Sequence, residues 1–464
     1  MHPGLSAART QALNSSTASH RSSVSDTQDT SLFYSLLALL VWIPLPLGSN
    51  KPWAVSLLCF AVFTLAIVWL LLFIRQRINL TPTFLKSLPV AALLLCAPLW
   101  AMLQVLFNIT IDAATTLQDA LLGCALVGLF CLTTLLVRSK RRIRLLCYAL
   151  VGSGLFQAVY GSMMTLTGVE YLFFVEKEHY RGLATGTFVN RNHLAGYLEL
   201  TLSVGIGLMI STLDGVRSAN WRDFFRRTLT TLLGNKARLR IILVMMVAGL
   251  VMTHSRMGNS AFFSSLAIAG VLALILSRRS TKATIILISS LIIIDIFVVG
   301  TFFGVDKVVE RLENTSENSE TRDEVNTYTL QAIQDNLFTG SGAGTYYTNF
   351  PAYREYDVGS IFYDHAHNDY FEFASDYGVI VTGCLLLAVL LVFISAIRAQ
   401  IKRRNPLMRG LAFSATMAII ALAIHSTVDF NLQIPANATT FVVILALGQI
   451  SLHLKSRGHK SRAR

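Results

Sequence analysis

Charged residues are scarce in this chain. Only 14% of its 464 residues are charged, whereas 53% are hydrophobic and the mean hydropathy is +0.55. Ordinary soluble domains are about one quarter charged, so this composition excludes a chain built from such domains. It predicts a protein that crosses a membrane several times.

The cysteines lack any pattern of paired use. All six fall inside apolar runs, without the CxxC spacing of a metal site, so no disulfide framework is expected. The first 31 residues are rich in Ser, Thr, Gln and Ala and contain no apolar core, which argues against a cleaved signal peptide. We predict that residues 1–31 form a disordered cytoplasmic tail.

Twelve apolar runs are long enough to be membrane helices, since a bilayer core needs about 20 apolar residues per helix. They predict an all-α polytopic membrane protein with about 12 transmembrane helices, nine within residues 32–304 and three within residues 377–455. The runs begin near residues 32, 52, 88, 117, 145, 193, 241, 260, 283, 377, 411 and 439.

The net charge of +13 is unevenly distributed along the chain. If both termini face inward, 30 of the 39 Lys and Arg residues fall in inner segments, the last of them the basic tail 456–464. This bias predicts an even number of spans with both termini cytoplasmic. Basic clusters such as 138–142 have two interpretations, nucleic-acid binding and contact with anionic lipid. Their position between spans favours membrane lipid as the partner and no nucleic acid.

Residues 305–376 form an outer segment far longer than the other outer loops. It contains four Lys or Arg against fourteen Asp or Glu and is rich in Tyr and Phe. Long loops are usually functional or disordered, and the aromatic residues favour a large, partly helical, folded loop before the tenth span. The outer segment 168–192 is also long enough to form a structure.

The sequence His-Ala-His-Asn-Asp-Tyr at 365–370 is the first candidate site. It opens an amphipathic pattern that leads into the tenth span, so His367 is placed to act as a base at the membrane surface. Two other interpretations remain open. His367 has a purely structural role in one, and Asp364, His365, His367 and Asp369 bind a metal in the other. The latter requires an extended segment, because residues two apart on a helix point to opposite sides.

Two arginines are candidates for binding phosphate. Arg256 follows His254-Ser255 at the outer end of an apolar run, where it binds either lipid phosphate or a substrate phosphate. Arg322 lies among acidic residues, so a surface salt bridge is its alternative role. Beyond it, Gly340, Gly342 and Gly344 resemble a phosphate-binding loop only weakly, and a tight loop that closes a helix is favoured.

Further polar residues gather at outer helix ends. Asn190, Arg191 and Asn192 open the sixth span, where they either hydrogen-bond a sugar or phosphate or cap the helix. Asp429 lies in the last outer loop, after His425. Asp295 is the acidic residue expected inside a span, the ninth, where it would face the bundle interior.

Together these motifs resemble the O-antigen ligase and polymerase family of bacterial inner-membrane glycosyltransferases. His367-Asn368, nine residues, Gly378 and, four later, Thr382 are similar to the family's His-[Asn/Ser/Gln]-x9-Gly-x3-[Gly/Thr/Tyr] signature. The other motifs that match in order are Gly186-Thr-Phe-Val-Asn190-Arg-Asn192, Ser255-Arg256-x-Gly258, and Arg322 ahead of Gly340-x-Gly342-x-Gly344. The resemblance covers about residues 180–440.

The resemblance implies a fold like that of C-type glycosyltransferases, in which 305–376 is periplasmic. It also implies transfer of a glycan from undecaprenyl pyrophosphate to an acceptor hydroxyl without metal, nucleotide or other cofactor. His367 would be the general base and Arg256 and Arg322 would bind the pyrophosphate. The residues expected to make further substrate contacts are Asn190, Arg191, Asn192, Tyr346, Arg354, Asn368 and Asp429.

The acceptor distinguishes the activities that share these motifs. We favour ligation of O-antigen to lipid A core, because no C-terminal soluble domain follows the twelfth span. A polymerase acting on O-antigen or exopolysaccharide, with a growing glycan as acceptor, and a protein O-oligosaccharyltransferase are the alternatives. A transporter of lipid-linked sugar is the alternative from another class. It is disfavoured because no internal repeat is evident and the polar groups gather at the outer face.

Overall fold

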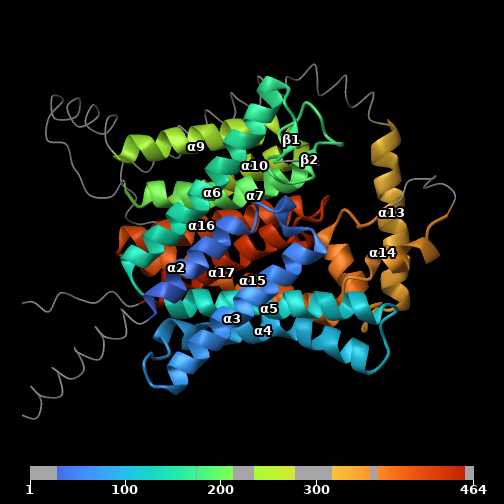
Figure 1. Cartoon of the computed structure of the whole chain (residues 1–464), viewed down its shortest axis with the longest axis horizontal. Helices are drawn as coiled ribbons and strands as arrows, with labels where there is room; N and C mark the ends of the chain where they lie inside the picture. Colours follow the sequence, from blue (N-terminus) through green and yellow to red (C-terminus); the bar gives the residue numbers. More distant parts are fainter. Residues whose placement is uncertain (1–28, 174, 213–234, 277–315, 356–362, 455–464) are drawn as a thin grey trace, which may run out of the picture.

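The computed structural model describes residues 29–173, 175–212, 235–276, 316–355 and 363–454 (Figure 1). Within these residues it is an all-α protein with one two-stranded antiparallel hairpin, β1 (Tyr171–Leu172) and β2 (Val175–Glu176). The predicted fold class is therefore confirmed.

Nine of the described helices are long and apolar enough to cross a membrane. They are α3 (Pro52–Ile74), α4 (Pro82–Leu106), α5 (Ala113–Leu136), α6 (Lys140–Thr167), α7 (Arg191–Ile210), α10 (Arg256–Leu276), α15 (Asp369–Lys402), α16 (Pro406–His425) and α17 (Pro435–His453). The expected runs from 32 and 241 form α2 (Thr30–Trp42), of 13 residues, and α9 (Asn235–Met252), which begins with basic residues. The expected run from 283, with Asp295, lies outside the described residues.

Helices α7, α16 and α17 form the centre of the bundle. Helix α7 packs against α6, α9, α10, α16 and α17, and every residue from His193 to Met209 is buried. Most of the apolar surface of helix α3 is exposed, as expected of a helix that faces lipid. Polar side chains on α7 therefore face other helices and not lipid.

The loops at one end of the bundle are joined by backbone and side-chain hydrogen bonds. The connections α2–α3, α4–α5, α6–α7, α9–α10 and α16–α17 all take part, together with the segments before α15. The bonds are Thr187 Oγ1 to Pro44 O at 2.6 Å, Ile111 N to Ser341 O at 3.0 Å, Ala184 N to Met252 O at 3.0 Å and Asp369 N to Ser426 O at 3.0 Å. We call this the outer end. Figure 1 shows α13 (Ser316–Asp335) beside it, lying across the bundle direction.

The long segment before α15 is partly helical, as expected. It contains α13, α14 (Tyr346–Asn349) and the 3-10 helix η2 (Phe350–Ala352). A small hydrophobic core holds these parts together, formed by Val325, Tyr328, Tyr346, Phe350, Tyr363 and Ala366. Four of the aromatic residues of this segment, Tyr328, Tyr346, Phe350 and Tyr363, thus lie in its interior.

Helix α15 is broken at Gly378, which has φ +77° and ψ 164°. A Cβ there would lie 2.4 Å from the carbonyl oxygen of Phe338, so only glycine fits this position. Residues 369–377 are therefore a short helix at the outer end, and the membrane span begins after the break.

The opposite end of the bundle is joined by a buried ion pair. Asp29, which is fully buried, accepts a hydrogen bond of 2.8 Å from Arg142, and Arg138 contacts its other carboxylate oxygen. We call these three residues the inner ion pair. Residues 29–31, which the sequence assigned to a disordered tail, belong to the start of α2 because Asp29 binds the α5–α6 connection.

Candidate functional site

A buried carboxylate with three histidines lies at the outer end. Asp429, in the α16–α17 connection, has its Oδ1 3.9 Å from Nε2 of His193 and 3.9 Å from Nδ1 of His367. Its Oδ2 lies 3.7 Å from Nε2 of His425. We call these four residues the Asp429 cluster. None of these imidazole nitrogens has a hydrogen-bond partner within the described part of the chain, so the groups attract one another without direct contact.

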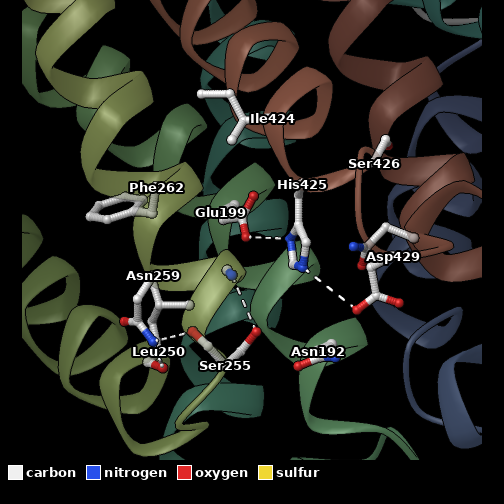
Figure 2. Close-up of polar contacts among 12 residues, drawn as sticks. Asn192, Glu199, Leu250, Ser255, Asn259, Phe262, Ile424, His425, Ser426 and Asp429 are labelled. Atoms are coloured by element: carbon white, nitrogen blue, oxygen red, sulfur yellow. Dashed lines mark hydrogen bonds and ion pairs between the residues drawn. The ribbon is translucent and has the colours of Figure 1, made fainter. Parts of the chain in front are cut away.

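His425 connects this cluster to the interior of the bundle. Its Nδ1 lies 2.8 Å from Oε1 of Glu199 on α7, and neither side chain is exposed at all. Figure 2 shows His425 between the carboxylates of Glu199 and Asp429. Glu199 is eight residues beyond the start of α7, or about 12 Å along the helix axis. A row of ionisable groups thus leads from within α7 to the outer end.

His367 is the member of the Asp429 cluster that reaches the surface, with 22% of its side chain exposed. Its backbone has φ +51°, an uncommon conformation for a residue other than glycine. Its ring stands edge-on to Phe430 at 4.9 Å and to Tyr363 at 6.2 Å. The unusual backbone and the two rings together fix the direction of this imidazole.

Two acidic residues of α15 hold the segment that carries His367. Glu372 binds Nδ1 of His365 at 2.6 Å and accepts the backbone N–H of Ala366 at 2.9 Å. Asp369 accepts the hydroxyl of Ser426 at 2.6 Å and the backbone N–H of Leu432. The base candidate and Asp429 are therefore positioned by the same short helix.

Neighbouring charges shift the pKa of His365 and the pKa of Asp429 in opposite directions. Burial lowers the pKa of His365, but the adjacent Glu372 carboxylate outweighs it and raises the pKa to about 9. Burial raises the pKa of Asp429, but the imidazoles of His367 and His425 outweigh it, and the pKa lies well below its usual range. Asp429 is thus a carboxylate at neutral pH and can stabilise a positively charged His367.

The four side chains considered for a metal are not arranged around a common point. His365 is bound to Glu372, and Asp369 is bound to Ser426 and Leu432. No three ligand-type side chains of the described residues are placed to hold a metal ion. His365 and His367 do share one contact, since His365 also stacks on Phe430 at 4.1 Å.

Two of the predicted asparagines begin helices. Asn190 accepts the backbone N–H of Asn192 at 2.8 Å at the start of α7. Asn368 accepts the N–H groups of Tyr370 and Phe371 at the start of α15. Both are N-caps, so for Asn190 the capping interpretation is confirmed. Asn192 is half-buried, and Figure 2 shows it below His425 and Asp429.

The arginines predicted to contact substrate belong to different segments of the chain. Arg256 is the exposed first residue of α10, directly after Ser255, which accepts the N–H of Gly258 at 3.2 Å. The guanidinium of Arg191 lies 5.8 Å from the ring centre of Tyr180. Arg354 is exposed, beyond η2. The side chain of Arg322 lies outside the described residues, although its backbone belongs to α13.

The glycine-rich loop is a tight internal turn, as the favoured interpretation predicted. The N–H groups of residues 340–344 donate to other parts of the protein, among them Asp376 and Gln104. The loop therefore does not offer these amides to a phosphate. Tyr346, expected to contact substrate, is buried, and its hydroxyl is 2.7 Å from that of Thr329. The structure places Tyr346 in the core of the outer segment.

Sequence reasoning missed Glu199, His193 and the role of His425. Glu199 is an acidic residue inside an apolar span, the signal that singled out Asp295. The transporter argument therefore missed an acidic residue within a span.

The close approach of α7 to its neighbours also depends on glycines. A Cβ at Gly196 would lie 2.2 Å from Oδ1 of Asn431, and one at Gly258 would lie 2.5 Å from Cβ of Ala195.

Comparison with known families places this site in context. Residues 241–386, about a third of the chain, match the O-antigen ligase family. The matched range includes Arg256, Arg322 and His367, whereas Glu199 and Asp429 lie outside it. No curated protein matches the sequence. The match, on a helical multi-pass membrane protein, supports the assignment of the chain to the O-antigen ligase family.

Proposed function

We propose that this protein transfers a glycan from undecaprenyl pyrophosphate to an acceptor hydroxyl, as an O-antigen ligase with lipid A core as acceptor. The family supports glycan transfer of the ligase or polymerase type in general. The observation that carries the proposed transfer to a hydroxyl is the position of His367, partly exposed at the outer end and 3.9 Å from the buried carboxylate of Asp429.

In the proposed step, the acceptor oxygen attacks the anomeric carbon of the glycan. The bond from that carbon to the pyrophosphate oxygen breaks, and the pyrophosphate leaves with the electron pair. Nδ1 of His367 faces Asp429, so Nε2 is the nitrogen proposed to take the hydroxyl proton. Asp429 then stabilises the imidazolium that forms. A single displacement of this kind inverts the anomeric configuration.

Positive charge for the leaving pyrophosphate is proposed to come from Arg256 and Arg322. A guanidinium suits this role because it binds phosphate oxygens through two parallel N–H groups. The position of Arg256 at the start of α10 adds the favourable end of the helix dipole. With guanidinium groups in this role, we propose a reaction that is independent of metal and other cofactors.

We further propose that the outer end faces the periplasm and that both termini are cytoplasmic, in the inner membrane. The charge bias, with 30 of 39 basic residues in inner segments, supports this orientation. In this arrangement 305–376 is the periplasmic loop, and it carries the candidate base His367. Arg191, Arg354, Asn192 and the surface around Asn190 are proposed to contact the glycan, whereas Asn368 acts through helix capping.

The test compares polysaccharide profiles on gels. A deletion strain is complemented with wild type, with His367→Ala, or with His179→Ala as a matched exposed control on the 168–192 segment. Lipopolysaccharide, secreted polysaccharide and lipid-linked polymer are measured at equal protein levels. We expect His367→Ala to remove O-antigen from lipid A core while lipid-linked polymer accumulates, and we expect His179→Ala to behave as wild type.

Other outcomes separate the alternatives. If His367→Ala shortens the polymer to single repeats, the protein is a polymerase with the same base. Loss of glycan from proteins with normal lipopolysaccharide would identify a protein O-oligosaccharyltransferase. If all profiles equal wild type, the assignment of His367 as base is wrong.

A further inference from the structure

Glu199 and His425 form a fully enclosed acid–imidazole pair behind the candidate base. Nδ1 of His425 lies 2.8 Å from Oε1 of Glu199, while its Nε2 lies 3.7 Å from Oδ2 of Asp429. Burial of ionisable side chains is costly unless they are paired. Neither residue touches the surface, so a direct contact with a glycan is not their role.

The geometry favours the positively charged form of His425. Each of its two ring nitrogens faces a carboxylate oxygen, one of Glu199 and one of Asp429. A neutral imidazole has one N–H and one lone pair, so beside an ionised Glu199 its lone pair would face a carboxylate. The imidazolium form, with a proton on both nitrogens, is the one that suits both neighbours.

The two carboxylate oxygens of Asp429 face different histidines. Oδ2 faces His425 of α16, whereas Oδ1 faces His193 of α7 and His367 of the 363–368 segment. Two further carboxylates of α15 lie near this group: Asp369 is bonded to Ser426 and Leu432, and Glu372 is bonded to His365. A positive charge on His425 next to Oδ2 therefore weakens the attraction between the Asp429 carboxylate and a proton on His367.

We propose that Glu199 and His425 are positioning residues that hold a fixed positive charge against Oδ2 of Asp429 and thereby set the readiness of His367 to take a proton. The functional meaning of this arrangement rests on the proposed role of His367 as base. The electrostatic arrangement itself can be measured without turnover. Removal of the charge on His425 leaves the Asp429 carboxylate less neutralised, so His367 becomes protonated at higher pH.

The experiment measures how readily His367 is modified as a function of pH. Diethyl pyrocarbonate reacts with the unprotonated imidazole, and mass spectrometry of the purified full-length protein in detergent gives the rate at His367 separately from other histidines. The variants are Glu199→Gln, His425→Gln and the double replacement, which removes both charges of the Glu199–His425 pair together. Glu170→Gln is the matched control, because Glu170 pairs with Lys177 in the 168–192 segment and not with the Asp429 cluster.

We expect all three variants to raise the midpoint of the pH profile of His367 by about one unit, and the control to leave it unchanged. If a single variant does not fold, the double replacement decides. A folded double variant with the wild-type midpoint, or with a lower one, overturns the proposal. The same holds if the control shifts equally, since the effect would then not be specific to this pair.

A pH–rate profile of glycan transfer separates this proposal from the proposed function. If the modification midpoint of His367 rises and the acidic limb of the rate profile moves with it, both stand. If the modification midpoint rises while transfer is unaffected by His367→Ala, the positioning by Glu199 and His425 stands and the role of His367 as base fails.

Discussion

Two buried aspartates, at opposite ends of the bundle, have very different partners. Asp29 is in direct contact with Arg138 and Arg142, whose guanidinium groups stay charged at any physiological pH. Asp429 faces three imidazoles at 3.7 to 3.9 Å, and imidazole is the side-chain group whose charge can change near neutral pH. The inner ion pair is suited to join helices, whereas the Asp429 cluster is suited to change its protonation.

The difference teaches how to separate structural from functional charge in this protein. Arg142 also donates to the carbonyl of Leu136 and lies over the ring of Phe33, so its partners are complete. The imidazole nitrogens that face Asp429 have no hydrogen-bond partner among the described residues. Buried polar atoms left in this way cost stability, and a role in function is one explanation for them.

The largest effect is expected from Asp429→Asn. This change removes the charge that stabilises protonated His367, so transfer should fall by about a thousandfold, within the range for general base catalysis. The rate of transfer per folded molecule and the thermal unfolding midpoint in detergent are both measured. A variant that loses stability but keeps its rate would mean that Asp429 is structural, like Asp29.

The reciprocal change, Asp29→Asn, should act on stability alone. It leaves the guanidinium groups of Arg138 and Arg142 without the carboxylate that they contact. This should lower the free energy of unfolding by about 3 kcal/mol. Unfolding in mixed micelles measures this, and transfer per folded molecule should stay at the wild-type level. A loss of rate in fully folded protein would contradict the separation of the two ends.

The pair of His365 and Glu372 is expected to make stability depend on pH. The pKa of His365 is raised to about 9, so its contribution is complete below the unfolded value of about 6.5 and is lost as pH rises through 9. The stability difference between wild type and His365→Gln should shrink by about 2 kcal/mol over this range, allowing for partial exposure. Unfolding at several pH values measures it; a difference that grows with pH would refute the pairing.

The smallest effect is expected from Arg141→Gln, which sharpens the comparison within one basic cluster. Arg141 is exposed, whereas its neighbour Arg142 is buried against Asp29. The change should alter the free energy of unfolding by less than about 0.5 kcal/mol, against a large loss for Arg142→Gln. Equal losses in the two variants would show that the cluster acts as a whole through lipid contact.

The sequence predicted the helical membrane fold because each span carries its own signal, a run of apolar residues of sufficient length. It also predicted the folding of the outer segment from its aromatic residues, and the tight loop at Gly340 to Gly344. The boundary at Asp29 could not be predicted, since the signal is a long-range contact with Arg142, 113 positions away.

The candidate site was only partly predictable for the same reason. His367 stood out because it lies near the end of the outer segment, just before a helix. Asp429 was only one of several polar residues at helix ends, because its neighbours His193 and His367 are distant in sequence. Glu199 was overlooked inside α7, although its charge within an apolar run was a usable signal. Tyr346 was misjudged because an aromatic residue that binds sugar and one that fills a core look alike in sequence.

The contact between Asn437 of α17 and the carbonyl of His193, at 3.0 Å, has a consequence for biosynthesis. Helix α17, which is synthesised long after α7, completes the surroundings of a site whose first members belong to α7. A nascent chain that has inserted α7 but not α16 and α17 lacks both His425 and Asp429. We therefore expect the proposed site to stay incomplete during membrane insertion until the hairpin of α16 and α17 joins the bundle.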